Sequence, residues 1–161
     1  MTRPVSALSR IALGCLLAVL PGCGGGGSSP SAPTTLPAGP VTTVVAQGTF
    51  HIGDPAAAIA SGQICDILAF VPFTTTATGT VAVSVSWSHA SNDLDIGLAR
   101  GSCTCATALA EQCDEVASSD SATAKPETLN ISNLAAGGYT LAILNNGPGT
   151  EAGSYHVTLT H

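Results

Sequence analysis

Basic residues are nearly missing from this chain. Its 161 residues include 4 Lys and Arg against 10 Asp and Glu, and two of the four bases, Arg3 and Arg10, lie within the first ten positions. From residue 23 onward only Arg100 and Lys125 stand against all ten acids, a net charge of −8. This balance excludes a nucleic-acid-binding surface, which needs several Lys or Arg side chains on phosphates.

Charge of either sign, long apolar runs and catalytic motifs are also scarce. Charged residues make up 9% of the chain, against about 25% in a typical soluble protein. No apolar stretch reaches the length of a membrane-spanning helix. Neither Gly-x-Ser-x-Gly nor His-Glu-x-x-His occurs, and the four histidines are scattered. We therefore expect a protein that is not an enzyme; the alternative, an unrecognised hydrolase, would need a cleft with a perturbed histidine or carboxylate.

The N-terminal residues have the pattern of an export signal. Residues 1–10 carry two arginines and no acid, and Ile11–Leu20 is an apolar run of ten residues. That run has the length of a signal-peptide core and is too short to cross a bilayer as a helix. It ends in Leu20-Pro21-Gly22-Cys23, which resembles the lipobox of bacterial lipoproteins, although Pro21 is unusual there.

The lipobox resemblance implies that residues 1–22 are removed and that Cys23 carries the lipid. Two or more acyl chains, such as palmitate, hold a protein durably on a membrane, whereas one chain binds only marginally. Gly24, rather than the Asp that often retains lipoproteins in the inner membrane, favours the outer membrane, facing the periplasm or the cell surface. An ordinary secretory signal with an incidental cysteine is the alternative.

A linker is expected between the lipid and the folded part. Residues 24–42 are rich in Gly and Ser and then in Pro, Thr and Ala, a composition that cannot bury enough apolar surface to fold. As a flexible coil this segment would span about 25 Å. We therefore divide the chain into a signal peptide (1–22), a lipidated linker (23–42) and a domain (43–161).

The domain has the alternating pattern of half-buried antiparallel strands. Apolar and polar residues alternate in five runs, 81–88, 93–99, 128–132, 139–143 and 154–160, and two more strands are expected near 48–52 and 66–73. Only residues 106–115 tolerate a helix. About eight strands in this length predict an all-β fold, a two-sheet antiparallel sandwich around one core.

Three segments resemble a known bacterial family. They are Asn92-Asp93-Leu94-Asp95-Ile96, Leu134-Ala135-Ala136-Gly137-Gly138-Tyr139 and Tyr155-His156-Val157-Thr158-Leu159. In this order they resemble the bacterial pre-peptidase C-terminal domain, which is appended to secreted proteases and other exported proteins. The resemblance implies a jelly-roll-like sandwich; the insertion at 101–114 and the lack of a neighbouring catalytic domain depart from the family pattern.

Four cysteines remain in the domain: Cys65, Cys103, Cys105 and Cys113. An even number in an exported chain predicts two disulfides. A bridge between Cys103 and Cys105 would enclose a single residue, so two pairings stay open: 65–103 with 105–113, or 65–105 with 103–113. Zinc binding by these cysteines is the alternative, but zinc ligand pairs usually have two to four residues between them.

The candidate metal ligands are Asn92, Asp93 and Asp95. The two carboxylates lie opposite the apolar stripe of their strand, about 7 Å apart, and Asn92 lies in the preceding turn. Hard oxygen ligands in this arrangement would suit calcium. The alternative is a solvated strand edge, and we expect the acidic residues Asp114, Glu115 and Asp120 to be solvated as well.

Aromatic residues bear on what the domain binds. Trp87, Tyr139 and Tyr155 lie on apolar stripes and should be core. A covered position in the core is also expected for Phe50, Phe70 and Phe73. However, residues 67–73 do not alternate, and the alternative is that their excess of apolar surface meets the linker, a loop or a partner. We predict a non-enzymatic, surface-anchored lipoprotein for adhesion, assembly or ligand display at the cell envelope, with a protein or glycan ligand. A carbohydrate- or matrix-binding module is the alternative, and it would need exposed aromatic platforms.

Overall fold

The computed structural model describes residues 38–161. The predicted signal peptide, the predicted lipidation site Cys23 and the expected linker up to residue 37 lie outside the described residues. Within 38–161, no helix has both the length and the apolar character required to cross a membrane.

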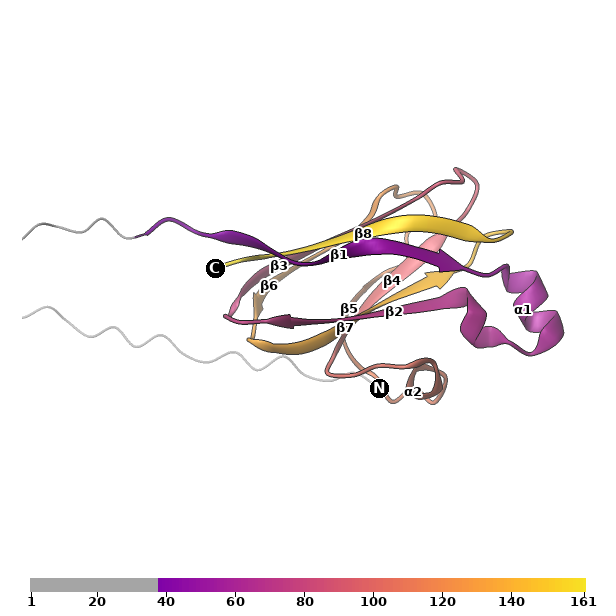
Figure 1. Ribbon diagram of the computed structural model, residues 1–161, viewed down its shortest axis with the longest axis horizontal. Helices are drawn as coiled ribbons and strands as arrows, with labels where there is room; N and C mark the ends of the chain where they lie inside the picture. The colour runs from indigo at the N-terminus through magenta and orange to yellow at the C-terminus, as the bar shows by residue number, and fades with distance from the viewer. Residues whose placement is uncertain (1–37) are drawn as a thin grey trace, which may run out of the picture. The chain divides into compact units, whose positions relative to one another are not determined.

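Eight strands form two antiparallel sheets, which confirms the predicted sandwich (Figure 1). The first sheet has the order β1-β8-β3-β6 and the second the order β2-β7-β4-β5. The strands are β1 (Thr42–Ile52), β2 (Leu68–Thr75), β3 (Gly79–Trp87), β4 (Leu94–Arg100), β5 (Asp114–Ser119), β6 (Glu127–Leu134), β7 (Gly137–Asn145) and β8 (Glu151–Thr160). The first and last strands pair along their length, and the backbones of Val41 and His161 exchange hydrogen bonds of 2.8 and 3.0 Å where that pairing ends.

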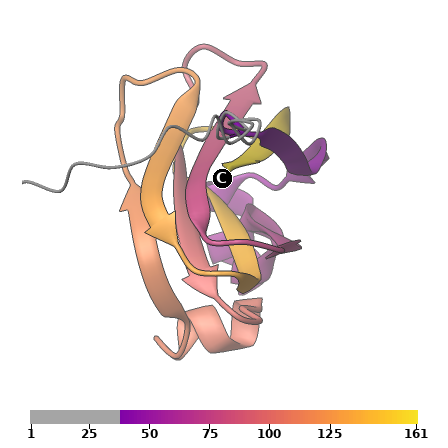
Figure 2. The ribbon, with the colours of Figure 1, turned by 90° about the vertical axis from the view of Figure 1, so that its left-hand side faces the viewer.

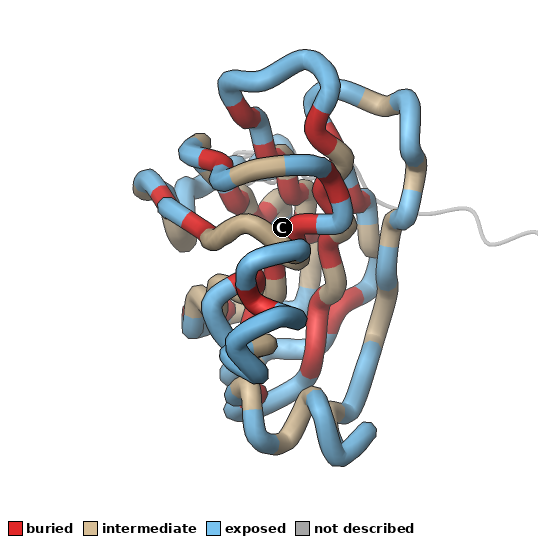
Figure 3. Tube along the Cα trace, turned by 90° about the vertical axis from the view of Figure 1, so that its right-hand side faces the viewer, coloured by how far each residue is buried: buried red, intermediate tan, exposed pale blue. Residues whose placement is uncertain are grey.

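The core lies between the sheets and follows the alternation of the sequence. Val81, Val83 and Val85 of β3 face Leu94, Ile96 and Leu98 of β4 across it, and all six are at most 2% exposed. Burying such side chains contributes about 1.5–3 kcal/mol each. Figure 3 shows the end of the sandwich next to α1, where exposed loops surround the buried strand ends.

Besides a short 3-10 helix, η1 (Ile64–Ile67), which includes the first two residues of the strand expected at 66–73, two elements were not expected from the sequence. The helix α1 (Pro55–Ser61) begins after Asp54, whose carboxylate accepts hydrogen bonds from the backbone N–H groups of Ala56 and Ala57, and ends at Gly62, which has a φ of 72°. These are ordinary start and stop signals, a capping Asp, a first-turn Pro and a left-handed Gly, but the helix has only seven residues. The other element is β5, in a stretch expected to be only a solvated acidic segment; its acidic residues are exposed, yet they pair with β4 at the sheet edge.

Two disulfides hold the insertion onto the sandwich. Cys65 is joined to Cys105 and Cys103 to Cys113, so the second of the two open pairings is the one present. The first bond ties the short 3-10 helix η1 (Ile64–Ile67) to the helix α2 (Cys105–Leu109), across a separation of 40 residues. Closing a loop of that size contributes about 4 kcal/mol in the chain-entropy model. As a result α2 is held outside the second sheet, as two perpendicular views show (Figures 1 and 2).

Candidate functional site

The outer face of the second sheet carries a row of small residues. Gly97 of β4 pairs with Ala142 of β7 on one side and with Ser118 of β5 on the other, and Ala142 pairs with Phe70 of β2. These residues alternate with the core positions of their strands, so they face outward. Because glycine and alanine fill little space, the sheet face is hollow at this row.

The hollow consists of two adjoining cavities. One has a volume of about 310 Å³ and extends toward α2; the other has about 270 Å³ and extends toward the start of β4. Gly97, Ala142 and Glu115 line both. We call the two together the acidic groove.

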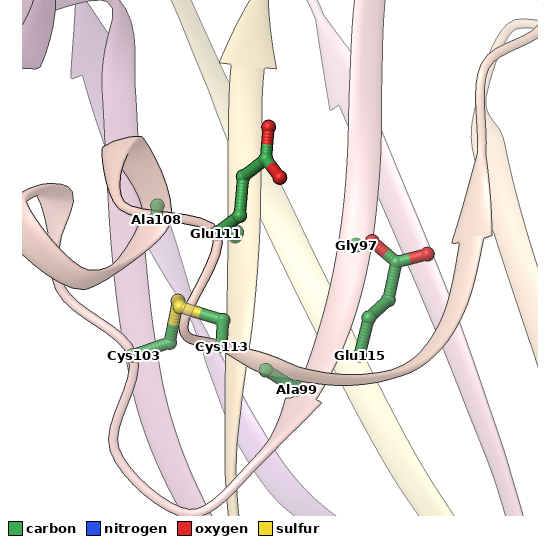
Figure 4. Close-up of a pocket in the computed structure, with 8 residues that line it drawn as sticks. Gly97, Ala99, Cys103, Ala108, Glu111, Cys113 and Glu115 are labelled. Carbon is green, nitrogen blue, oxygen red and sulfur yellow. A yellow bond between two sulfur atoms is a disulfide. The ribbon is translucent and has the colours of Figure 1, made fainter.

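The first cavity has an apolar floor and a disulfide wall (Figure 4). Gly97, Ala99 and Ala142 form the floor, and Ala108 of α2 and the Cys103–Cys113 bond form the wall. Glu111, after α2, and Glu115, on β5, complete the lining, and in Figure 4 both side chains extend in a similar direction. The disulfides and the sheet thus fix the floor and the wall, whereas both glutamates are exposed.

Local hydrogen bonds explain why the insertion folds over the sheet. Thr140, which is 1% exposed, accepts a bond from the Cys103 backbone N–H (3.2 Å) and donates one to the Gly101 carbonyl (2.7 Å). The side chains of Thr104 and Thr107 bond the backbone of each other in a reciprocal cap at the start of α2. Such a cap satisfies N–H groups that the first turn of a helix leaves free.

Glu111 has a backbone conformation that disfavours its side chain. It follows the C-cap of α2 with a φ of 55°, the left-handed conformation in which glycine is preferred. A residue with a side chain costs about 1–2 kcal/mol there. The chain therefore accepts a less favourable residue at the position that places a carboxylate at the acidic groove.

The second cavity adds carboxylates to an apolar shelf. Leu68 and Leu144 pair next to the small-residue row, and Asp95 pairs with Leu144 on the other side. Asp95 and Asp120 line this cavity together with Glu115. Burial raises the pKa of Asp95, and the neighbouring Asp93 carboxylate raises it further, while the Asn146 amide acts in the opposite direction.

Neither basic residue of the domain lines the acidic groove. Arg100 forms an ion pair with Asp114 at 3.5 Å and lies over the Tyr139 ring. Lys125 lies 4.7 Å from the centre of the Trp87 ring and donates a hydrogen bond to the His89 carbonyl. The carboxylates of the groove therefore have no Lys or Arg partner among residues 38–161.

Two of the predicted calcium ligands, Asn92 and Asp95, form hydrogen bonds with different partners within the fold. Asn92 is 5% exposed, and its Nδ2 donates to Glu151 Oε2 at 2.8 Å. Asp95 accepts a hydrogen bond from the Asn146 amide. In the described part of the chain no three His, Cys, Asp or Glu side chains are grouped closely enough to hold a metal ion. Calcium at Asn92, Asp93 and Asp95 stays a prediction.

Some oxygen atoms near these residues have no hydrogen-bond partner. They are Oδ1 of Asn92, Oδ1 of Asp93 and Oε2 of Glu127, and all three are buried. The Glu127 side chain is held at its other oxygen by the Ser119 hydroxyl and the Ser121 N–H. Buried oxygens without a hydrogen-bond partner are uncommon. Two of the three belong to predicted calcium ligands, and a bound cation would satisfy them.

Glu151 was not singled out from the sequence, although it organises this end of the sandwich. Its carboxylate accepts hydrogen bonds from the backbone N–H groups of Ser88 (3.0 Å), His89 (3.1 Å) and Ala152 (2.9 Å), and from the Asn92 amide (2.8 Å). Burial acts to raise the pKa of Glu151, but these donors outweigh it and lower the pKa to about 2. The donors come from positions up to 63 residues away, so no local pattern could reveal them.

The aromatic residues lie mostly in the core. Phe50 and Phe73 are buried there with Trp87 and Tyr139, which confirms the expectation for these four, and Tyr155 packs against them partly exposed. Phe70 differs, because it is half-buried on the outer face beside Ala142. Among residues 38–161 no aromatic side chain is exposed.

Comparisons with known proteins add little about function. No protein-family model matches the chain, and no curated protein matches it. A solved structure with a similar course of the chain is that of Yersinia pseudotuberculosis-derived mitogen, at 16% identity and a TM-score of 0.47, covering 74% of this chain and 87% of that one. We draw no functional conclusion from this similarity.

Proposed function

We propose that the chain is a lipid-anchored, non-enzymatic binding module of the bacterial cell envelope. Its sandwich engages a ligand or partner through the acidic groove, for adhesion, assembly or ligand display. The observation that carries this proposal is the groove itself: two adjoining cavities on an outward sheet face, with a floor of small residues and a lining of carboxylates.

The lipid anchor in this proposal is supported by the sequence alone. The lipobox resemblance at Leu20–Cys23 supports lipidation of Cys23, and the Gly, Ser and Pro-rich segment after it supports a tether between the bilayer and β1. A tether of about 25 Å on average would leave the groove accessible to other envelope components.

The exposure of the aromatic residues favours a protein partner over a glycan. Sugar-binding surfaces use aromatic rings as flat platforms, whereas Phe70 is half-buried and the other aromatics of the domain belong to the core or pack against it. An outward apolar residue beside hollow, acid-lined cavities is better suited to the side chains of a protein.

The proposal is tested on the full chain in bacterial cells, by detergent-phase partitioning and by formaldehyde crosslinking. Gly97→Leu fills the groove, because a Cβ atom at Gly97 meets nothing closer than Glu115 Oε2 at 4.0 Å. Gly138→Leu is the matched control, since a Cβ there meets nothing within 4 Å and the residue lines neither cavity.

We expect the wild-type chain in the detergent phase, with a discrete crosslinked species. Cys23→Ala should leave the detergent phase, Gly97→Leu should stay in it without the crosslinked species, and Gly138→Leu should behave as the wild type. Wild-type protein in the aqueous phase would contradict the anchor. The same crosslinked species from Gly97→Leu would contradict binding at the groove.

A further inference from the structure

We infer that the acidic groove binds an extended peptide segment that carries lysine or arginine side chains. This inference rests on the proposed function and names its ligand. The ligand is a segment of a partner protein, and its basic side chains enter the two cavities.

The charge of the groove selects for cations. Glu111, Glu115, Asp95 and Asp120 line it, and the domain around it has ten acidic residues against two basic ones. Among residues 38–161, the only hydrogen bond to the Glu115 carboxylate is from the Ser118 hydroxyl, at 2.8 Å. A surface of one sign attracts partners of the other and raises their local concentration. An anionic ligand would meet repulsion from every charged group that lines the groove.

The floor selects for side chains with an apolar stem. Gly97, Ala99 and Ala142 leave the floor without a charge, and Leu68 and Leu144 continue it as an apolar shelf. Lys and Arg place an aliphatic stem along apolar surface and keep the charged end at its margin. The floor of the groove would contact the aliphatic stem, and the carboxylates that line the groove would contact the charged end.

The spacing of the groove suits an extended chain. The cross-strand rows that form it are two residues apart along β4, at Asp95, Gly97 and Ala99. This is about 7 Å between rows, the same interval at which side chains repeat on one face of an extended peptide. Two basic residues separated by one other residue would therefore place one side chain over each cavity.

The test measures fluorescence anisotropy of labelled hexalysine with the mature full chain in a nonionic detergent. Hexaglutamate and a neutral Gly-Ser hexapeptide are the comparison probes, and unlabelled spermidine is the competitor. The variants are Glu111→Gln, Glu115→Gln and their combination, together with Gly97→Leu. The matched control is the double variant Asp54→Asn/Asp66→Asn, which removes the same charge away from the groove and keeps a good helix cap at position 54.

We expect saturable binding of hexalysine only, weakened by added salt. Each single Glu→Gln variant should weaken binding about threefold and the combination about tenfold, since each exposed ion pair contributes a modest amount. The Asp54→Asn/Asp66→Asn control should leave the affinity almost unchanged. Gly97→Leu should abolish binding while its circular dichroism spectrum stays that of the wild type, and Ala142→Leu provides a second filled groove should Gly97→Leu misfold.

Several results would overturn the inference. If the two double variants, in the groove and in the control, lower the affinity for hexalysine equally, the peptide responds only to the net charge of the domain. Wild-type affinity in both filled-groove variants would place the peptide elsewhere. Equally tight, groove-dependent binding of spermidine would make the ligand a small polyamine rather than a peptide. A groove-dependent crosslinked species in cells without hexalysine binding would refute this inference alone, and the proposed function would stand.

Discussion

Glu151→Gln should cost the domain much of its stability, because one buried carboxylate satisfies four donors. The Glu151 side chain is fully buried, and it joins the backbone of Ser88 and His89, at the end of β3, to Asn92 before β4. Glutamine keeps the shape but replaces one oxygen by an amide NH₂ group. That group would face donors whichever way the amide is turned, so at least one buried N–H loses its acceptor.

The pKa of Glu151 gives the size of the effect. A carboxyl with a pKa of about 2 in the folded protein, against 4.5 for an ordinary glutamate in water, stabilises the fold at neutral pH by about 3 kcal/mol. Hydrogen bonds to a charged group, at about 1.5–3 kcal/mol each, give a loss of the same order when the charge is removed. A domain of this size is stable by about 5–15 kcal/mol in total, so the variant should unfold at much lower denaturant concentration.

The assay is urea unfolding followed by Trp87 fluorescence between pH 7 and pH 2. Because the pKa of Glu151 is lowered on folding, its contribution is fully present above the unfolded-state pKa and is lost as the pH falls toward about 2. The gap in unfolding free energy between wild type and Glu151→Gln should therefore be about 3 kcal/mol at pH 7 and should close in acid.

Glu111→Gln is the matched control, since that glutamate is exposed and accepts no comparable set of backbone N–H groups. It should shift the unfolding free energy little at any pH. A Glu151→Gln variant within about 0.5 kcal/mol of the wild type, the range of an ordinary surface substitution, would refute this account of Glu151. So would a gap that stays constant down to pH 2.

Two further predictions concern the cysteines and the candidate calcium residues. Alkylation of the unreduced protein should add no alkyl group to any of the four domain cysteines, and mass spectrometry should find no bound zinc; two or more labelled cysteines would contradict the disulfides. If Asp93 and Asp95 hold calcium, millimolar calcium should raise the melting temperature by several degrees through binding to the folded form, and Asp95→Asn should reduce that rise. A melting curve that neither calcium nor a chelator changes would mean that the two aspartates bind no calcium; they would then be partly buried carboxylates at the start of β4, rather than the solvated strand edge expected from the sequence, because β4 lies between β7 and β5.

The strands of the core could be predicted from the sequence because each has its own alternating pattern. Val81, Val83 and Val85 alternate with smaller or polar residues, and such a pattern needs no knowledge of the partner strand. The strand β5 escaped prediction because it lies at a sheet edge, where Asp114 and Glu115 can remain in solvent while their backbone pairs with β4. The start and stop signals of α1 were present, but seven residues are too few for a helical period to show.

The candidate site depends on contacts that no local pattern contains. Gly97 and Ala142 are unremarkable small residues in the sequence, and only the register that pairs them beside Phe70 makes a hollow. The sequence left two disulfide pairings open, because both join Cys65 to the insertion. The left-handed conformation of Glu111 follows from the way α2 ends, and the sequence carries no glycine or asparagine there to signal it.

Carboxyl-group footprinting of the protein in bacterial cells tests the central claim most directly. A carbodiimide and glycine ethyl ester modify exposed carboxylates, and peptide mass spectrometry then compares cells with the purified protein. Occupation of the acidic groove predicts that labelling of Glu111, Glu115 and Asp120 falls in cells, while labelling of the exposed Asp66, outside the groove, does not. Equal labelling of the three groove carboxylates in cells and in the purified protein would contradict the claim that this groove is a binding surface.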